Sequence, residues 1–371
     1  HILSAHEQGA AHAADGYARA SGKVGVVIAT SGPGATNLVT GIANAYLDSV
    51  PIIAITGNVP CSLIGRDSFQ EVDITGITMP IVKHNFIVKD ITKLADIIRE
   101  AFVIAKSERP GPVLIDIPKD IQTGSCEFVR AEAHKPKSFA AAEPDDIDKA
   151  VKMIKQSERP FIYCGGGIIA GGAEEEVLKL ADRIDAPIGF SMMGISAVPS
   201  SNERALGMVG MHGRYAAIKA KAKADLVLAL GVRFSDRATG NKNAYIPGAN
   251  IIHIDIDPAE INKNITSHLG IVGNVKDILN ALLEKTEKMN HNQWQEEIKV
   301  FREVENGFKE RGGGGFTPYK VIECIGSAAS PEMPVATDVG QHQMWVAQHY
   351  RFMKPRTFIT SGGLGTMGFG M

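Results

Sequence analysis

Short apolar runs alternate with helical patterns along the first third of the chain. Residues 24–29 and 51–56 are apolar almost throughout, which is typical of parallel strands that are buried on both faces. Residues 35–47 and 91–106 carry apolar side chains at helical spacing, and residues 113–117 form a further apolar run. This order of elements predicts an α/β domain with a mainly parallel sheet.

The same alternation begins again after residue 144. We predict a helix at 145–155 and strands at 161–164, 187–190, 226–230 and 251–255. Helical patterns separate the first three of these strands. These elements predict a second α/β domain.

A third α/β unit is predicted after the four glycines of residues 312–315, which follow a polar helical pattern at 293–309. It has a helix at 318–328 and strands at 334–337 and 357–360. The sequence begins without Met and stops before this unit could complete a sheet. We therefore expect an excerpt of a longer protein that is cut at both ends.

The fold class that follows is three consecutive α/β domains with mainly parallel sheets. Residues 124–144 lack periodicity, as linkers do. The predicted boundaries are 1–123 for the first domain, whose N-terminus is missing, 124–144 for a linker, 145–290 for the central domain, 291–316 for a second linker and 317–371 for the start of a truncated third domain.

Composition excludes several classes of partner. The 371 residues are 44% hydrophobic and carry a formal net charge of -2, so no strong field attracts nucleic acid or anionic lipid. The apolar runs are far too short to span a bilayer, and we expect neither nucleic acid nor a membrane as a partner. Four cysteines lie far apart without CxxC spacing, which favours reduced thiols in a cytosol over disulfides or a zinc site.

An acid and a glycine-rich turn are the candidate features of the first domain. Glu7 heads an alanine-rich helical run, whose small side chains let backbone or a ligand approach closely. The ordinary interpretation of such a residue is a solvated acid in the first turn of a helix. The turn at 31–34 and Asn37 follow a predicted strand, where parallel sheets present backbone N–H groups to ligands. On its own, a Gly-Pro-Gly turn is more often structural.

The central domain has candidate ligand residues at the ends of its predicted strands. Residues 165–167 fit the loose G-x-G-x-x-G/A pattern of dinucleotide-binding turns, although glycines are abundant here. Asp255 ends a strand, where a carboxylate can accept hydrogen bonds from the hydroxyls of a ribose. Asp257 fits better as the cap of the helix that follows. Arg233 and Arg237 follow a buried strand and suit a phosphate or an electron-rich ring.

Taken together, these motifs resemble one enzyme family. The runs 6–19, 31–37 and 43–60 are similar to the pyrimidine-binding domain of thiamine-diphosphate enzymes. Four further segments resemble the acetohydroxyacid synthase branch, also called acetolactate synthase: MVGMHG at 208–213, GVRFSDRATG at 231–240, HIDIDPAE at 253–260 and DVGQHQMW at 338–345. The resemblance implies a pyrimidine-binding first domain, a Rossmann-like central domain that binds FAD, and a diphosphate-binding third domain.

The resemblance also implies an activity and its partners. The reaction is thiamine-dependent decarboxylation of pyruvate and transfer of the two-carbon hydroxyethyl unit to pyruvate or 2-ketobutyrate, in branched-chain amino-acid biosynthesis. The implied cofactors are thiamine diphosphate, Mg²⁺ and FAD, with the metal ligands outside this sequence and the flavin without a part in net redox chemistry. The implied assembly is a homodimer or homotetramer with shared active sites, in the cytoplasm of a bacterium or archaeon, and a small regulatory subunit is a further implied partner.

Residues of the thiamine site follow from the resemblance. Glu7 would bond the pyrimidine ring of the cofactor, and burial against alanines is expected to raise its pKa. Phe69 and Gln70 would line the cofactor and substrate channel, while Lys83 and Lys119 would attract anionic keto acids to its mouth. Further contacts to the thiamine cofactor are assigned to Pro33, Asn37, Gln341, His342, Gly365, Thr366 and Met367.

Residues of the flavin site follow in the same way, from the central domain and one arginine of the first. No metal ligand is assigned within the chain. The residues that would surround FAD are Arg109, Gly165, Gly166, Gly167, Ser191, Met192, Val209, Gly210, Met211, His212, Gly231, Val232, Arg233, Phe234, Ser235, Asp236, Arg237, Asp255, Ile256, Asn274 and Val275.

Four hypotheses compete at this point. The first is the flavin-containing synthase. The second is a flavin-free catabolic acetolactate synthase or another thiamine-diphosphate decarboxylase or carboligase. The third is a nicotinamide oxidoreductase, supported only by residues 165–170, and the fourth is a non-enzymatic scaffold of degenerate α/β domains. The last two are disfavoured because neither explains why Glu7 and the ligand loops occur together.

Overall fold

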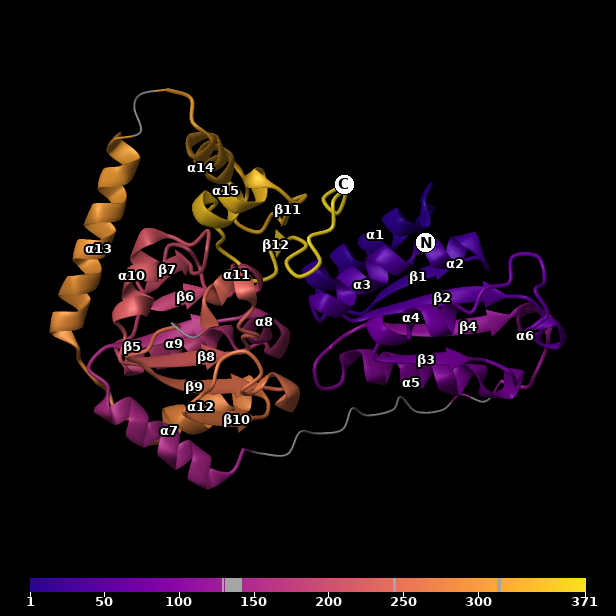
Figure 1. The fold of residues 1–371 in the computed structure, drawn as a ribbon, viewed down its shortest axis with the longest axis horizontal. Helices are drawn as coiled ribbons and strands as arrows, with labels where there is room; N and C mark the ends of the chain where they lie inside the picture. The colour runs from indigo at the N-terminus through magenta and orange to yellow at the C-terminus, as the bar shows by residue number, and fades with distance from the viewer. Residues whose placement is uncertain (129, 131–141, 243–244, 312–314) are drawn as a thin grey trace. The chain divides into compact units, whose positions relative to one another are not determined.

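A computed structural model describes the chain except for residues 129, 131–141, 243–244 and 312–314 (Figure 1). The described residues form two compact units. The first unit comprises residues 1–138, 336–339 and 359–371, and the second comprises residues 139–335 and 340–358. Most of the predicted linker 124–144 lies outside the described residues.

A four-stranded parallel sheet forms the centre of the first unit, in the order β1-β2-β4-β3. Three of its strands were predicted because they are apolar, and β2 and β4 are largely buried. The edge strand β3 was missed because its sequence, HNFI, is half polar and only partly buried. The strands are β1 (Gly25–Ala29), β2 (Ile52–Asn58), β3 (His84–Ile87) and β4 (Val113–Pro118).

Helix α1 packs closely on α3 in the first unit, as its alanines predict. A Cβ atom added to Gly41 of α3 would collide with the Cβ of Ala11. The helix predicted at 35–47 is divided into α2 and α3 at Leu38. The helices are α1 (Glu7–Ser21), α2 (Pro33–Asn37), α3 (Val39–Leu47), α4 (Ile74–Thr78), α5 (Leu94–Lys106) and α6 (Lys119–Thr123), with short 3₁₀ turns η1 (Cys61–Leu63), η2 (Met79–Ile81) and η3 (Ile91–Lys93).

A six-stranded parallel sheet forms the centre of the second unit, in the order β10-β9-β8-β5-β6-β7. This is the doubly wound order. The chain adds strands toward one edge from β5 to β7, and then toward the opposite edge from β8 to β10, so the switch point lies between β5 and β8. The strands are β5 (Pro160–Cys164), β6 (Ile188–Phe190), β7 (Ala205–Met208), β8 (Leu226–Leu230), β9 (Asn250–Asp255) and β10 (Leu269–Val272). The unpredicted strands β7 and β10 are short edge strands that are only partly buried.

Helices cover both faces of this sheet and enclose two apolar cores (Figure 1). Leu228 of β8 joins the core under α7 (Pro144–Gln156), α9 (Glu174–Arg183) and α12 (Val275–Lys285), while Val227 joins the core under α10 (Tyr215–Lys223) and α13 (Asn292–Arg311). The remaining elements are α8 (Gly166–Gly171), α11 (Asp236–Thr239), α14 (Pro318–Ala328), α15 (Gln341–His349), η4 (Met192–Gly194), η6 (Pro258–Glu260) and the strand pair β11 (Val335–Ala336) and β12 (Phe358–Ile359).

The range predicted as the second linker, 291–316, consists mostly of α13. Trp294 of this helix is buried and donates its indole N–H to the carbonyl of Pro160 at 3.1 Å, so the helix belongs to the second unit. The domain boundaries themselves remain a prediction. None of the described helices is long and apolar enough to cross a bilayer.

Candidate functional site

Glu7 lies where the first helix meets the turn after the first strand. It is the first residue of α1 and is half-buried. The side-chain amide of Asn37, at the end of α2, donates a hydrogen bond to Glu7 Oε2 at 3.0 Å. Because α2 follows β1 directly, this contact places the carboxylate at the edge of the sheet where parallel strands present ligand-binding groups.

The expectation that burial raises the pKa of Glu7 is wrong. The hydrogen bond from Asn37 lowers this pKa below its ordinary value, and a backbone hydrogen bond lowers it further. Alanines pack behind the helix, but they leave the carboxylate in partial contact with water, so the cost of desolvation is the smaller effect. Glu7 is therefore ionised at neutral pH in the unliganded chain.

Two glycines of the turn at 31–34 are required by close contacts. A Cβ atom on Gly34 would lie 2.7 Å from Thr30 Cγ2 and 3.3 Å from Glu7 Oε1. Gly32 has φ of +61°, and its Cβ would lie 2.8 Å from the carbonyl oxygen of Gln70. The turn thus has a structural reason for its glycines, and a side chain at position 34 would press against the Glu7 carboxylate.

A loop closed by Glu71 brings Gln70 against this turn. The Glu71 carboxylate accepts hydrogen bonds from the backbone N–H groups of Ser68, at 2.8 Å, and Gly65, and these bonds lower its pKa. Gln70 has φ of +60°, and Phe69 beside it is 89% exposed. Sequence reasoning missed Glu71, because an acid that closes a loop has no signature of its own.

The two candidate channel lysines differ in their surroundings. The Lys83 ammonium donates to the Ser107 carbonyl at 2.6 Å and hydroxyl at 3.3 Å, and to a further carbonyl at the end of α5. Burial lowers the pKa of Lys83 to about 8. Its three donors are occupied, which supports a role as a helix cap rather than as an attractant for substrate. Lys119 is exposed at the start of α6, directly after β4.

Glycines also bring together the two turns at the switch point of the six-stranded sheet. Gly165 follows β5 and Gly231 follows β8, and a Cβ atom on Gly165 would collide with the Gly231 carbonyl. The Gly167 N–H donates to that carbonyl at 3.2 Å. Ligands of doubly wound sheets bind at this point. The glycine pattern therefore has a packing cause, and its position is that of a binding crevice.

Other predicted flavin residues divide into buried and exposed groups. The side chains of Val209, Val232 and Phe234 are buried in the core that α10 and α13 cover, so only their backbone could face a ligand. The loop of residues 210–213 lies against α11, because the N–H of Met211 donates to the carbonyl of Arg237 at 2.9 Å. The residues exposed there are Met211, His212, Ser235, Asp236 and Arg237.

The polar residues at the ends of β9 and β10 have defined local roles. Asp257 caps η6 by accepting from the N–H of Ala259 at 2.9 Å, which confirms the capping interpretation. Asp255 is buried, and its carboxylate accepts from the N–H of Asp257 at 3.0 Å. Asn274 caps α12.

Some flavin residues predicted elsewhere also have structural contacts. Ser191 caps η4. Val275 is buried in the core that α7, α9 and α12 cover. Met192, Gly210 and Ile256 are half-buried. Arg109 belongs to the first unit, where its Nε donates to the Ser49 hydroxyl at 2.8 Å.

The residues predicted from the third domain are found in both units. Gln341 and His342 are exposed at the start of α15, in the second unit. Gly365, Thr366 and Met367 belong to the first unit. Thr366 is buried, and its hydroxyl donates to the Asn44 side chain at 3.1 Å, whereas Met367 is exposed.

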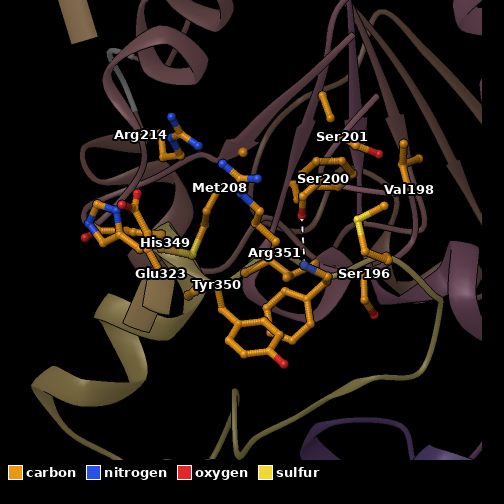
Figure 2. Close-up of a pocket in the computed structure, with 18 of the residues that line it drawn as sticks. Ser196, Val198, Ser200, Ser201, Met208, Arg214, Glu323, His349, Tyr350 and Arg351 are labelled. Carbon is orange, nitrogen blue, oxygen red and sulfur yellow. Dashed lines mark hydrogen bonds between the residues drawn. The ribbon is translucent and has the colours of Figure 1, made fainter. Parts of the chain in front are cut away.

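A cavity of about 500 Å³ lies in the second unit, between the ends of β6 and β7 and the helices α14 and α15. Figure 2 shows Ser196, Met208, Arg214 and Tyr350 around it. None of the predicted site residues lines this cavity. Within the described part of the chain, no three His, Cys, Asp or Glu side chains are grouped closely enough to hold a metal ion.

Three family models match the chain in consecutive ranges. Residues 1–77 match the N-terminal TPP binding domain of thiamine pyrophosphate enzymes. Residues 147–282 match the central domain of the same enzymes, and residues 338–371 match their C-terminal TPP binding domain. The three matches occur in the order that the predicted domains require.

Curated relatives match over the whole chain. It is 46% identical to the probable acetolactate synthase large subunit of Methanocaldococcus jannaschii, covering 65% of that protein, and 43% identical to the acetolactate synthase large subunit of Buchnera aphidicola, covering 66% of it. It is 46% identical to the acetolactate synthase large subunit of Corynebacterium glutamicum and covers 60% of that protein. The chain thus spans somewhat less than two thirds of the length of these relatives.

We predict that replacing Asn37 with Ala raises the pKa of Glu7 in the unliganded protein. The substitution removes the hydrogen bond that favours the ionised carboxylate. Because the pKa of folded Glu7 is depressed, this bond stabilises the fold above the ordinary pKa of a glutamate, and the contribution is lost as pH falls through the depressed value. An NMR titration of the Glu7 carboxyl carbon measures the shift.

Thr36→Ala is the control for this titration, since the Thr36 hydroxyl donates to the Pro33 carbonyl at 3.1 Å within the same short helix. It should leave the Glu7 titration unchanged. An unchanged Glu7 pKa in Asn37→Ala would show that the amide does not stabilise the charged carboxylate.

Proposed function

The chain belongs to the family of thiamine pyrophosphate enzymes, and we propose that it acts as part of an acetolactate synthase catalytic subunit. The proposed reaction decarboxylates pyruvate and transfers its two-carbon unit to a second 2-keto acid, which is pyruvate or 2-ketobutyrate. The observation that carries the proposal is the Glu7 carboxylate, held by Asn37 next to Gly34, where any side chain would crowd it. Identities of 43–46% to acetolactate synthase large subunits support it.

Glu7 supplies the acid-base group of this site. When bound, thiamine diphosphate supplies the nucleophilic carbon and the electron sink for decarboxylation. An ionised carboxylate can accept a proton from, or share one with, a ring nitrogen of that cofactor. A ring placed over the carboxylate would exclude water and raise its pKa toward neutrality, where proton exchange is efficient. In the free chain the lowered pKa keeps Glu7 ionised, so its carboxylate can accept a hydrogen bond from the cofactor.

Substrate contacts are proposed for the loop that Glu71 closes. Phe69 is exposed, and the Gln70 backbone packs against Gly32 in the same turn as Gly34. An apolar ring and an amide suit a small keto acid, which has a methyl or ethyl group at one end and a carboxylate at the other. Lys119 is the better candidate to attract this anion, since the Lys83 ammonium caps α5.

FAD is proposed for the switch point of the six-stranded sheet. The turns at Gly165 and Gly231 offer backbone groups there, with Arg233 nearby for phosphate and Asp255 for a ribose. These residue types fit a dinucleotide. Mg²⁺ is proposed to accompany the diphosphate of the thiamine cofactor, and the residues that the structure describes contain no cluster of ligands for it.

We propose a homodimer or homotetramer with shared active sites, in the cytoplasm, with a small regulatory subunit as a possible further partner. Support for a subunit contact comes from β1. Its outward side chains Val26 and Ile28 are 46% and 71% exposed, which is unusual for the apolar face of a strand. A partner subunit would bury this face.

Replacing Glu7 with Gln should lower acetolactate formation by about a hundredfold to ten-thousandfold, because an amide cannot exchange a proton with the cofactor. The measurement is acetolactate formation from pyruvate by the full-length protein, with thiamine diphosphate and Mg²⁺ added. Glu100→Gln is the control, since Glu100 is exposed on α5 and its replacement should leave the activity unchanged. Wild-type activity in Glu7→Gln would refute the proposed role.

The purified full-length protein should be yellow and show a flavin absorption spectrum. Bound FAD at the switch point distinguishes the biosynthetic synthase from a flavin-free catabolic enzyme of the same family. Release of about one FAD per chain after denaturation is the quantitative measure. A colourless protein that still forms acetolactate would favour the flavin-free alternative.

A further inference from the structure

A buried polar cluster on α1 and α3 has no part in the proposed reaction. Asp15 and Asn44 are fully buried, and the Arg19 and Asp48 side chains are 9% and 0% exposed. Burying such groups is costly unless every one of them has a partner. Arg19 and the two aspartates pair with one another, and Arg19, Asn44 and Asp48 find further partners in residues 360–366, more than 300 positions along the chain and within the same compact unit.

Arg19 is the hub of this cluster. Its guanidinium forms a salt bridge with Asp15, one turn earlier in α1, and a second salt bridge with Asp48 at 2.9 Å. A third donor reaches the carbonyl of Thr360 at 3.0 Å. Burial alone would lower the pKa of Arg19, but the two aspartates raise it above its ordinary value, so the guanidinium is always charged. A planar group with several fixed donors can make all of these contacts at once.

Asp48 and Asn44 hold the far segment. The Asp48 carboxylate accepts from the backbone N–H groups of Gly362 at 3.0 Å and Gly363 at 2.8 Å. Asn44 Oδ1 accepts from the hydroxyls of Ser361 and Thr366. A Cβ on Gly363 would lie 2.9 Å from both Asp48 Oδ1 and Leu47 Cβ, so only glycine permits this approach.

An aromatic anchor extends the contact beyond the ionic cluster. The ring of Phe369 is buried, with the Arg19 guanidinium 5.3 Å from its centre on one side. His12 of α1 packs edge-on against the same ring, also at 5.3 Å between ring centres. The segment is therefore held along α1 by charge, by hydrogen bonds and by apolar burial.

The helix that receives the segment is the one that begins with Glu7. Asp15 and Arg19 are four residues apart on one face of α1, and Glu7 is the first residue of the same helix. The distance from the start of the helix to Arg19 is on the order of 18 Å, spanned by continuous α-helix. A rigid element thus joins the proposed acid-base group to the segment that contains Gly365 and Thr366.

We propose that Arg19 and Asp48 form a clamp that fixes residues 360–366 on α1 and thereby sets the affinity for thiamine diphosphate. Both are positioning residues. The inference rests on the proposed function, because it takes residues 365–367 to be cofactor contacts. The four-membered group of Asp15, Arg19, Asn44 and Asp48 acts as a unit, since loss of one member removes a hydrogen bond or charge partner from at least one buried neighbour.

Arg19→Lys in the full-length protein tests the clamp. The guanidinium makes four hydrogen bonds from three separate nitrogens, whereas an ammonium has three donors on a single atom and cannot reproduce this fork. We expect amide hydrogen exchange of Gly362, Gly363 and Thr366 to become at least tenfold faster, with β2 and β4 unaffected. We also expect the dissociation constant for thiamine diphosphate, measured by calorimetry with Mg²⁺ present, to rise about tenfold or more.

Arg204→Lys is the matched control. Arg204 also bridges two aspartates, Asp182 at 2.7 Å and Asp185 at 2.9 Å, but in the second unit. The Arg204→Lys variant should have a lower free energy of unfolding than the wild type and an unchanged affinity for thiamine diphosphate. If Arg19→Lys does not fold, Asp48→Asn is measured in its place, because it keeps the shape and removes the charge and one of the two acceptor oxygens.

The outcomes separate the clamp from the proposed function. A wild-type protein that does not bind thiamine diphosphate would overturn the proposed function itself. A wild-type protein that binds it, together with a variant of unchanged affinity or unchanged exchange at 360–366, would overturn the clamp. A fall in unfolding temperature alone, with wild-type affinity, would show that the cluster is only structural.

Discussion

The hydrogen bond from Asn37 to Glu7 is the contact on which the candidate site depends. It joins the start of α1 to the end of α2, two elements that different parts of the sequence supply, and it keeps the carboxylate ionised. Parallel strands make this meeting possible because their carboxyl ends lie along one edge of the sheet. The Gly34 position then keeps the carboxylate approachable, since any side chain there would stand against it.

The two units use glycine in the same physical way. In the first, Gly32 and Gly34 let a turn approach Gln70 and Glu7, and in the second, Gly165 and Gly231 let two turns touch at the switch point. In each case a Cβ would meet another residue at less than normal contact distance. Glycine thus lets one backbone segment approach another at the sheet edges where these folds bind ligands. Close packing and ligand binding therefore both favour glycine at these positions.

Local sequence patterns predicted much of the fold, but they did not predict contacts between residues that are far apart in the sequence. The strands β1, β2, β4, β5 and β8 were predicted because their residues are almost all apolar. The edge strands β3, β7 and β10 were missed because β3 is half polar and β7 and β10 are only four residues long. The Asp257 cap was predicted from its place before a proline. The pKa of Glu7 was predicted in the wrong direction, because exposure and the Asn37 bond depend on tertiary structure. The contact of Asp48 with residues 362 and 363 has no local signal at all.

The central claim is that the Glu7 carboxylate is the group that meets the thiamine ring. The most direct measurement follows the carboxyl carbon of Glu7 by NMR at neutral pH while thiamine diphosphate and Mg²⁺ are added to the full-length protein. The account predicts that the signal of an ionised carboxylate moves toward that of a protonated one as the cofactor binds, because a ring excludes water from it. A Glu7 signal that stays at its ionised position while the cofactor saturates the protein would contradict the account.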